Sequence, residues 1–275
     1  MNVFDLHCDT PYMHMSGLAP AVSEETVRPF PEYTACTALW VDDRAAEPAA
    51  LYRRLLAASA LVPFRHILTL EGFCFAEGPA AVDRIAADGI RAVTLTWNYN
   101  NRLAGGCLDD GALTGLGKAV IRRMNALGLL LDLSHINEKS FFPALEASER
   151  PFVSHGNLKA VHDCPRNLSD AQAAALAARG GVIGICLYPA FLGDGDVFAR
   201  VYENIVRAEE MGLKAALGSD FDGADMDPAL NTPAKLLDLR DFLTKKGFTD
   251  TMLEHFFYKN AAGLFAGLYK TGGVV

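Results

Sequence analysis

A short, almost continuously apolar run followed by a helical pattern recurs eight times along the 275 residues of the chain. Runs of this kind are typical of strands that are buried on both faces of a parallel sheet. They occupy residues 3–6, 36–41, 67–70, 92–95, 129–133, 152–153, 181–187 and 215–217. Eight strands that alternate with helices in a chain of this length predict a (β/α)8 TIM barrel of the α/β class.

The segments between the runs carry signals for helix ends. Thr114 is expected to cap a helix that stops at Gly128, and Ser169 with Gln172 forms a capping box. Beyond the eighth run, residues 232 to about Tyr269 have a helical pattern, so extra C-terminal helices are expected.

An open, doubly wound sheet is the alternative fold. It would be favoured by a phosphate-binding glycine fingerprint after the first strand, and the sequence has none there. The glycines at 115 and 117 precede a helix but follow no strand. We therefore expect a single barrel domain over residues 1–275.

Charge and cysteine usage exclude several classes of partner. The chain has 25 Lys and Arg against 33 Asp and Glu, a net charge of -8, and no basic run, so nucleic acid is not expected as a partner. The longest stretch without these charged residues has 14 residues, too few to span a bilayer. Six scattered cysteines without a CxxC pair indicate reduced thiols. We expect a cytoplasmic protein with no membrane partner.

Polar residues follow five of the predicted strands, at the end where TIM barrels carry their active sites. All are of types that bind metals, and they are His7, Asp9, Glu71, His135, His155 and Asp220. A single Asp or His at a strand end is usually a cap or a satisfied polar group. Five such coincidences at the same end of five strands favour a metal site instead. His14, His66, His162 and His255 are expected to lie outside it.

The spacing suggests how the ions would be held. His7 and Asp9 are two residues apart, so both side chains can point into the barrel at one ion while Cys8 points outward. His135 and His155 on neighbouring strands could hold a second ion, and Glu71 could bridge the pair. Asp220 would then be free to act as the general acid and base.

At this point the sequence resembles the membrane (renal) dipeptidase family of the amidohydrolase superfamily, in its bacterial, unanchored form. The motifs that carry the resemblance are DLHCDTP at 5–11, LEG at 70–72, TLT at 94–96, DLSH at 132–135, SH at 154–155, PRNL at 165–168, RGGVIG at 179–184 and GSDFDG at 218–223.

The resemblance implies one zinc on His7 and Asp9, a second zinc on His135 and His155, and Glu71 as the bridge. It also implies that Asp220 is the catalytic acid and base. It adds Arg166 as the residue that binds the free carboxylate of the substrate, a task that suits a planar guanidinium. The family further suggests a homodimer.

The sequence departs from the family pattern in two places. Better-known members have a histidine after the TLT motif, where it contacts the substrate's oxygen, and this chain has Trp97. An indole NH can donate a hydrogen bond but cannot become a cation. Cys8 and Thr10 replace the more usual Asn and Leu around Asp9.

Together these features predict a binuclear zinc dipeptidase in which a metal-bridging hydroxide attacks the scissile bond of a small dipeptide. Another small amide, a lactam or an ester on the same metal pair is an alternative substrate. Phosphotriesterase-like relatives usually bridge their metals with a lysine on strand four, and this strand has none. A non-catalytic, metal-stabilised binding protein is the alternative from another class.

Overall fold

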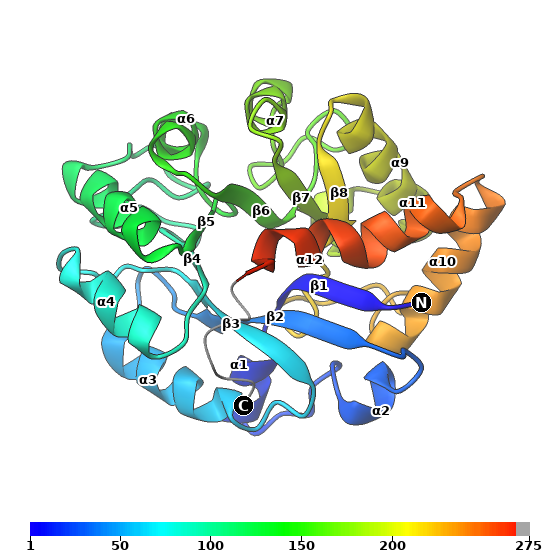
Figure 1. Ribbon diagram of the computed structural model, residues 1–275, viewed down its shortest axis with the longest axis horizontal. Coiled ribbons are helices and arrows are strands. Elements are labelled where there is room, and N and C mark those ends of the chain that lie inside the picture. The colour runs from blue at the N-terminus through cyan, green and yellow to red at the C-terminus, as the bar shows by residue number, and fades with distance from the viewer. Residues whose placement is uncertain (268–275) are drawn as a thin grey trace.

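The computed structural model describes residues 1–267, and its eight parallel strands pair in chain order (Figure 1). The strands are β1 (Val3–Cys8), β2 (Tyr33–Trp40), β3 (Arg65–Glu71), β4 (Ala92–Thr94), β5 (Leu130–Asp132), β6 (Pro151–Gly156), β7 (Val182–Ile185) and β8 (Lys214–Leu217). The first strand meets the segment after the last strand through a bridge between Cys8 and Phe221. This arrangement confirms the predicted (β/α)8 barrel.

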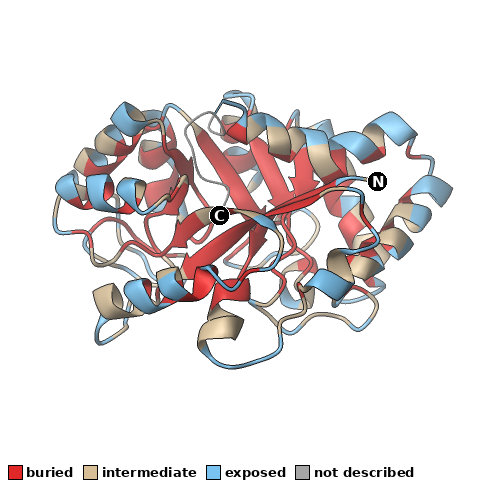
Figure 2. Cartoon of the chain, turned by 60° about the horizontal axis from the view of Figure 1, so that its bottom comes forward, coloured by how far each residue is buried: buried red, intermediate tan, exposed pale blue. Residues whose placement is uncertain are grey.

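Helices surround the strands on the outside (Figures 1 and 2). They are α1 (Thr10–Met15), α2 (Glu24–Val27), α3 (Pro48–Ser59), α4 (Ala80–Ala87), α5 (Gly115–Leu127), α6 (Glu138–Ala147), α7 (Asp170–Ala177), α8 (Pro189–Leu192), α9 (Val197–Glu210), η1 (Pro233–Lys235), α10 (Leu236–Lys245), α11 (Asp250–Glu254), η2 (His255–Lys259) and α12 (Asn260–Phe265). None of the helices in the described residues is long and apolar enough to cross a membrane.

The predicted helix ends are confirmed. The Thr114 side chain accepts a hydrogen bond from the Gly117 amide, and α5 stops at Gly128, whose φ of 72° is left-handed. Ser169 and Gln172 form the capping box of α7. The predicted C-terminal helices are present as α10 to α12, whereas Tyr269, their predicted end, lies outside the described residues.

The amino-terminal half of the barrel interior is filled by apolar side chains. They come from all eight strands and are Phe4, Leu6, Cys36, Ile67, Ala92, Leu130, Phe152, Val182 and Ala216. Phe265 of α12 inserts among them, with ring centroids 5.6 Å from Phe4 and 6.2 Å from Phe152. The Asn260 side chain also donates to the Ala215 carbonyl at 2.8 Å. The C-terminal helix therefore closes this end of the barrel.

Two buried carboxylates tie neighbouring strands together at mid-height in the barrel. Asp5 accepts hydrogen bonds from the amides of His7 and Ser219, at 3.2 and 2.8 Å. Asp132 accepts from the amides of Ser134 and Ser154, both at 3.0 Å. Each carboxylate fixes the chain immediately before a predicted site residue, because buried polar groups hold their partners firmly.

The outer core lies between the strands and the helices, and Cys8 packs into it as predicted. Two consecutive rings of α6 differ in their contact with this core, because Phe141 is 1% exposed and Phe142 is 37% exposed. Consecutive residues on an α-helix point about 100° apart, so α6 can bury only one of the two rings.

Candidate metal centre

The six predicted metal-site residues come together at the carboxyl ends of the strands. His7 and His155 lie on β1 and β6, Glu71 ends β3, and the other three follow β1, β5 and β8. They form three overlapping groups in which the ligand atoms lie within 4.8 Å of one another. The groups are His7 with Asp9 and Glu71, Glu71 with His135 and His155, and His7 with His155 and Asp220. His14, His66, His162 and His255 belong to none of these groups.

The first group is arranged around the imidazole of His7. Its Nε2 lies 3.2 Å from Asp9 Oδ2, 3.6 Å from Glu71 Oε2 and 3.8 Å from Asp220 Oδ1. Asp9 comes directly after β1, and its carboxylate lies next to the His7 imidazole, as their spacing predicts.

The second group is arranged around the other oxygen of Glu71. Glu71 Oε1 lies 2.5 Å from His135 Nε2 and 3.5 Å from His155 Nε2. The two Nε2 atoms are 2.9 Å apart. Glu71 therefore turns one oxygen toward each group, which is the position of a bridging carboxylate.

Both histidines of the second group are held through their Nδ1 atoms. His135 Nδ1 lies 2.8 Å from Asn98 Oδ1, and His155 Nδ1 lies 2.8 Å from Ser154 Oγ. Ser154 is in turn hydrogen-bonded to Ser134 at 3.2 Å. These contacts orient each ring and leave Nε2 facing the centre, as hydrogen bonds to the other ring nitrogen of metal-binding histidines usually do. Asn98 was not predicted as a site residue, although its position directly after Trp97, beyond the carboxyl end of β4, points to the same end of the barrel.

The loop that carries Asn98 is anchored by Asp43, which follows β2. Asp43 accepts hydrogen bonds from the amides of Trp97 and Tyr99, at 2.8 and 3.1 Å, and from the Asn101 side chain at 2.7 Å. Burial raises the pKa of Asp43 to about 6, against these hydrogen bonds, which lower it. Asp43 thus fixes the backbone on both sides of Asn98.

The electrostatics of the centre suit a cation. Three buried carboxylates, Asp9, Glu71 and Asp220, face one guanidinium, that of Arg166. Burial lowers the pKa of His7, but the carboxylates of Glu71, Asp9 and Asp220 outweigh burial and raise that pKa to about 10. Burial and Arg166 lower the pKa of His135, which favours the neutral imidazole that binds metals.

Two further details fit a metal at this centre. Asp9 Oδ1 is buried without a hydrogen-bond partner, a costly arrangement unless a ligand contacts it. A Cβ on Gly223 would lie 2.2 Å from Asp9 Oδ2 and 2.7 Å from Asp220 Oδ1. The absence of a side chain at residue 223 therefore keeps space open beside the carboxylates.

The backbone around the site has an uncommon conformation. Among the described residues, only three that are not glycine have positive φ, and they are His135 at 66°, Asp220 at 66° and Asp222 at 67°. Such angles are uncommon outside glycine and cluster at functional sites. Asp222 accepts hydrogen bonds from Thr10 Oγ1 at 2.7 Å and from the Ala21 amide at 2.6 Å. The hydroxyl of Thr10 therefore helps to hold the Asp222 side chain, a contact that the sequence did not predict.

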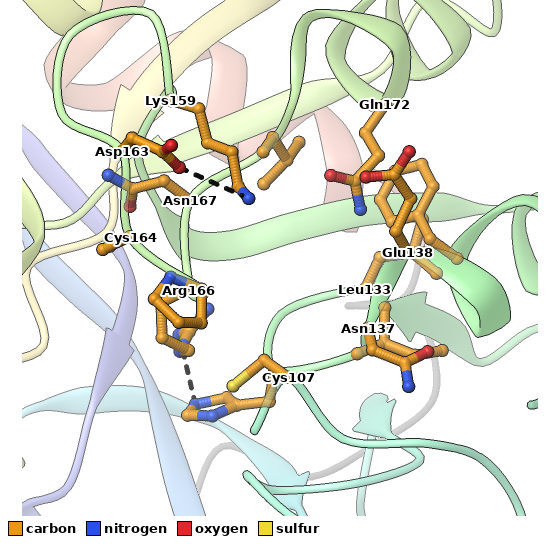
Figure 3. A pocket seen from close by; sticks show the side chains of 15 residues that line it. Cys107, Leu133, Asn137, Glu138, Lys159, Asp163, Cys164, Arg166, Asn167 and Gln172 are labelled. Carbon is orange, nitrogen blue, oxygen red and sulfur yellow. Dashed lines mark hydrogen bonds and ion pairs between the residues drawn. The ribbon is translucent and has the colours of Figure 1, made fainter. Parts of the chain in front are cut away.

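Arg166 lies beside the metal-site residues and is only 7% exposed. Its Nη2 lies 3.1 Å from the His155 carbonyl oxygen and 3.2 Å from His135 Nε2. Its guanidinium carbon is 5.1 Å from the centroid of the Phe191 ring. Arg166 also lines a cavity of about 440 Å³, which we call the small cavity (Figure 3). Arg166 is therefore a buried residue and not a solvated arginine of a loop.

Trp97 lines a second cavity of about 880 Å³, which we call the large cavity and which includes Asp9, Glu71, His135, His155 and Asp220 in its walls. The ring of Trp97 packs edge-on against Trp40, with centroids 5.1 Å apart, and Trp40 packs against Tyr12 at 5.3 Å. Tyr188 and Phe191 add further aromatic surface. The two cavities share His135 in their walls.

Comparison with known proteins gives a family match. Residues 57–266 match the membrane dipeptidase family, peptidase family M19. The matched range contains Glu71, His135, His155, Arg166 and Asp220 but not His7 or Asp9. An uncharacterized dipeptidase of Schizosaccharomyces pombe is 32% identical over 200 residues, which is 68% of this chain and 49% of the relative. The chain thus spans about half the length of that relative.

Two solved structures share the fold. The dipeptidase AC, a metallopeptidase of family M19, superposes with a TM-score of 0.89 at 19% identity, over 96% of this chain and 97% of the other. A metallopeptidase from Rhodobacter sphaeroides, solved with a phosphinate mimic of the dipeptide L-Ala-D-Ala, gives 0.81 at 18% identity, over 96% and 98%.

Proposed function

Because this chain belongs to the membrane dipeptidase family, we propose that it is a binuclear zinc dipeptidase built as one domain over residues 1–275. The observation that carries the proposal is the placement of Glu71, whose two carboxylate oxygens face two different groups of ligand atoms. His7 and Asp9 would hold one ion with Glu71, and His135 and His155 would hold the other. Two ions that share a carboxylate are typical of metal-assisted hydrolases.

The ions, when bound, would lower the pKa of a shared water to about 7 and polarise the carbonyl of the scissile bond. The residues of this chain supply the remaining functions. Asp220 stands next to the first group, and a carboxylate at this position can take a proton from the attacking water and deliver it to the leaving amine. The Cys186 thiol donates to Asp220 Oδ2 at 3.6 Å and helps to hold its orientation.

Arg166 would bind the terminal carboxylate of the dipeptide. Its guanidinium is the one cationic side chain among the described residues that line either cavity and also contact the metal-site histidines. A longer peptide would present an amide at this position instead of a carboxylate, so Arg166 would also limit substrate length. The amino-terminal residue would then lie in the large cavity against Trp97, Trp40 and Tyr12.

Metal content and substrate selection test the proposal together. Protein purified without chelator should contain close to two divalent ions per chain by elemental analysis, and the metal-loaded enzyme should hydrolyse free dipeptides in preference to carboxyl-amidated ones. One ion per chain or fewer would contradict the binuclear site. Equal rates on free and amidated dipeptides would instead remove Arg166 from substrate binding.

A further inference from the structure

The small cavity is lined by segments that follow β4, β5 and β6, and it shares His135 with the large cavity. Its volume of about 440 Å³ lies within the range of small-molecule sites. The function proposed above uses only its Arg166 wall and leaves the rest of the space unexplained.

Two residues that line this cavity carry polar atoms that have no partner. Arg166 Nε and Asn167 Oδ1 are both buried without a hydrogen bond, and these residues are only 7% and 2% exposed. Nearly all buried polar groups in proteins are paired, and an unpaired one costs free energy. Two such atoms in residues that line one cavity indicate that a polar ligand completes this site.

The remaining walls are apolar inside and charged at the rim. The apolar part is formed by Leu133, Ile136, Phe141, Pro165 and Leu168. At the rim, Lys159 and Asp163 form an ion pair at 3.4 Å. Glu138, across the cavity from Arg166 in Figure 3, is exposed and has no ion-pair partner among the described residues. If Arg166 pairs with the substrate carboxylate, the carboxylate of Glu138 is the one charge of the cavity walls that is not balanced by a partner.

We infer that the small cavity receives the side chain of the carboxyl-terminal residue of the dipeptide, an inference that rests on the proposed dipeptidase function. Arg166 lines this cavity, so a substrate residue whose carboxylate binds Arg166 would carry its side chain next to the cavity. The apolar walls accommodate a long methylene stem, and Glu138 attracts a cationic end. The site selects lysine or arginine over glutamate at the second position of the substrate.

The test compares three substrates that differ only in their second residue, which are Ala-Gly, Ala-Lys and Ala-Glu. The wild-type enzyme should show kcat/KM about two- to fivefold higher for Ala-Lys than for Ala-Glu, as expected for one exposed charge pair. Glu138→Gln should abolish most of this preference, and Glu138→Lys should reverse it. Activity on Ala-Gly should remain unchanged in both variants.

Asp250→Lys is the matched control, because Asp250 is also an exposed acidic residue in the first turn of a helix but lines neither cavity. It should keep the wild-type ratio of Ala-Lys to Ala-Glu. If wild type hydrolyses Ala-Gly but all Glu138 variants give the same ratio, the assignment of the small cavity is overturned and the dipeptidase function stands. Failure of the metal-loaded wild type to hydrolyse any of the dipeptides would overturn both.

Discussion

At its amino end the barrel is filled by Phe4, Phe152 and Phe265, whereas at its carboxyl end it holds three carboxylates, three imidazoles and a guanidinium. Both ends are buried, but the groups have opposite requirements. Aromatic rings stabilise the fold simply by leaving water. Buried charged groups cost free energy unless each finds a partner.

The two ends also differ in backbone strain. All three non-glycine residues with positive φ in residues 1–267 lie at the carboxyl end, and two of them are site residues, His135 and Asp220. Residues held in such conformations cost about 1–3 kcal/mol each and persist only where the surrounding structure fixes them. The amino end therefore stabilises the fold, whereas the carboxyl end holds strained and charged groups at a cost in stability. Substitutions at the two ends should separate effects on stability from effects on activity.

The largest effect is expected from Asp220→Asn at the carboxyl end. The amide keeps the shape of the side chain but cannot carry a proton, so kcat should fall by roughly 10²–10⁴-fold. Metal content and melting temperature should stay close to wild type, as elemental analysis and thermal unfolding would show. Near-wild-type kcat on the best dipeptide would mean that Asp220 is not the proton carrier.

Phe265→Ala tests the amino end. It removes a ring that is 0% exposed and should lower the free energy of unfolding by about 3–5 kcal/mol, measured by urea denaturation. The folded fraction should keep its kcat and its metal content, and Phe265→Leu should recover much of the stability. A loss of kcat in fully folded protein would show that the two ends are not separable.

Arg166→Met sharpens the contrast within the carboxyl end. Met retains apolar contact with Phe191 but loses the charge, so kcat/KM for free dipeptides should fall by about ten- to a hundredfold. That range corresponds to the roughly 1.5–3 kcal/mol expected for a charged hydrogen bond. Carboxyl-amidated dipeptides should be affected far less. An equal loss on both substrates would assign Arg166 a purely structural role.

The smallest effect concerns Asp43, which supports the carboxyl end from outside the metal-site groups. Its pKa is raised from 3.8 to about 6, so between these values the folded state keeps a proton that the unfolded state has lost. The stability of wild type relative to Asp43→Asn should therefore fall by about 1–2 kcal/mol from pH 4 to pH 6 and stay constant above. Denaturation curves over this range would show it. A difference that rises with pH would mean that hydrogen bonding outweighs burial at Asp43.

The strands, and the six polar residues that come together at their carboxyl ends, could be predicted because both depend on local patterns. Buried parallel strands read as apolar runs, and His7 with Asp9 shows the two-residue period of a strand. The weakest prediction was β6, expected over two residues and observed as Pro151–Gly156, because Ser154 and His155 interrupt its apolar pattern.

Features that depend on distant contacts could not be predicted in this way. Asn98 lies in an irregular loop and meets His135 across 37 positions, and Thr10 meets Asp222 across 212. The small cavity has no signature in the sequence either, because segments that follow three different strands form its walls. Such features form only when the chain has folded, and the hydrophobic periodicity of the sequence does not predict them.

The join between β1 and the segment after β8 has a consequence for how the protein is made. Asp5 and Ser219 lie 214 positions apart, and Asp220 donates its amide to the His7 carbonyl at 3.1 Å. The ribosome synthesises the amino end first. One edge of β1 therefore stays unpaired until residues 219–221, about four fifths of the way along these 275 residues, have been synthesised. A product that terminates before residue 219 would retain His7 and Asp9 but neither Asp220 nor the second edge partner of β1. Assembly of the site therefore depends on the segment after β8 reaching β1.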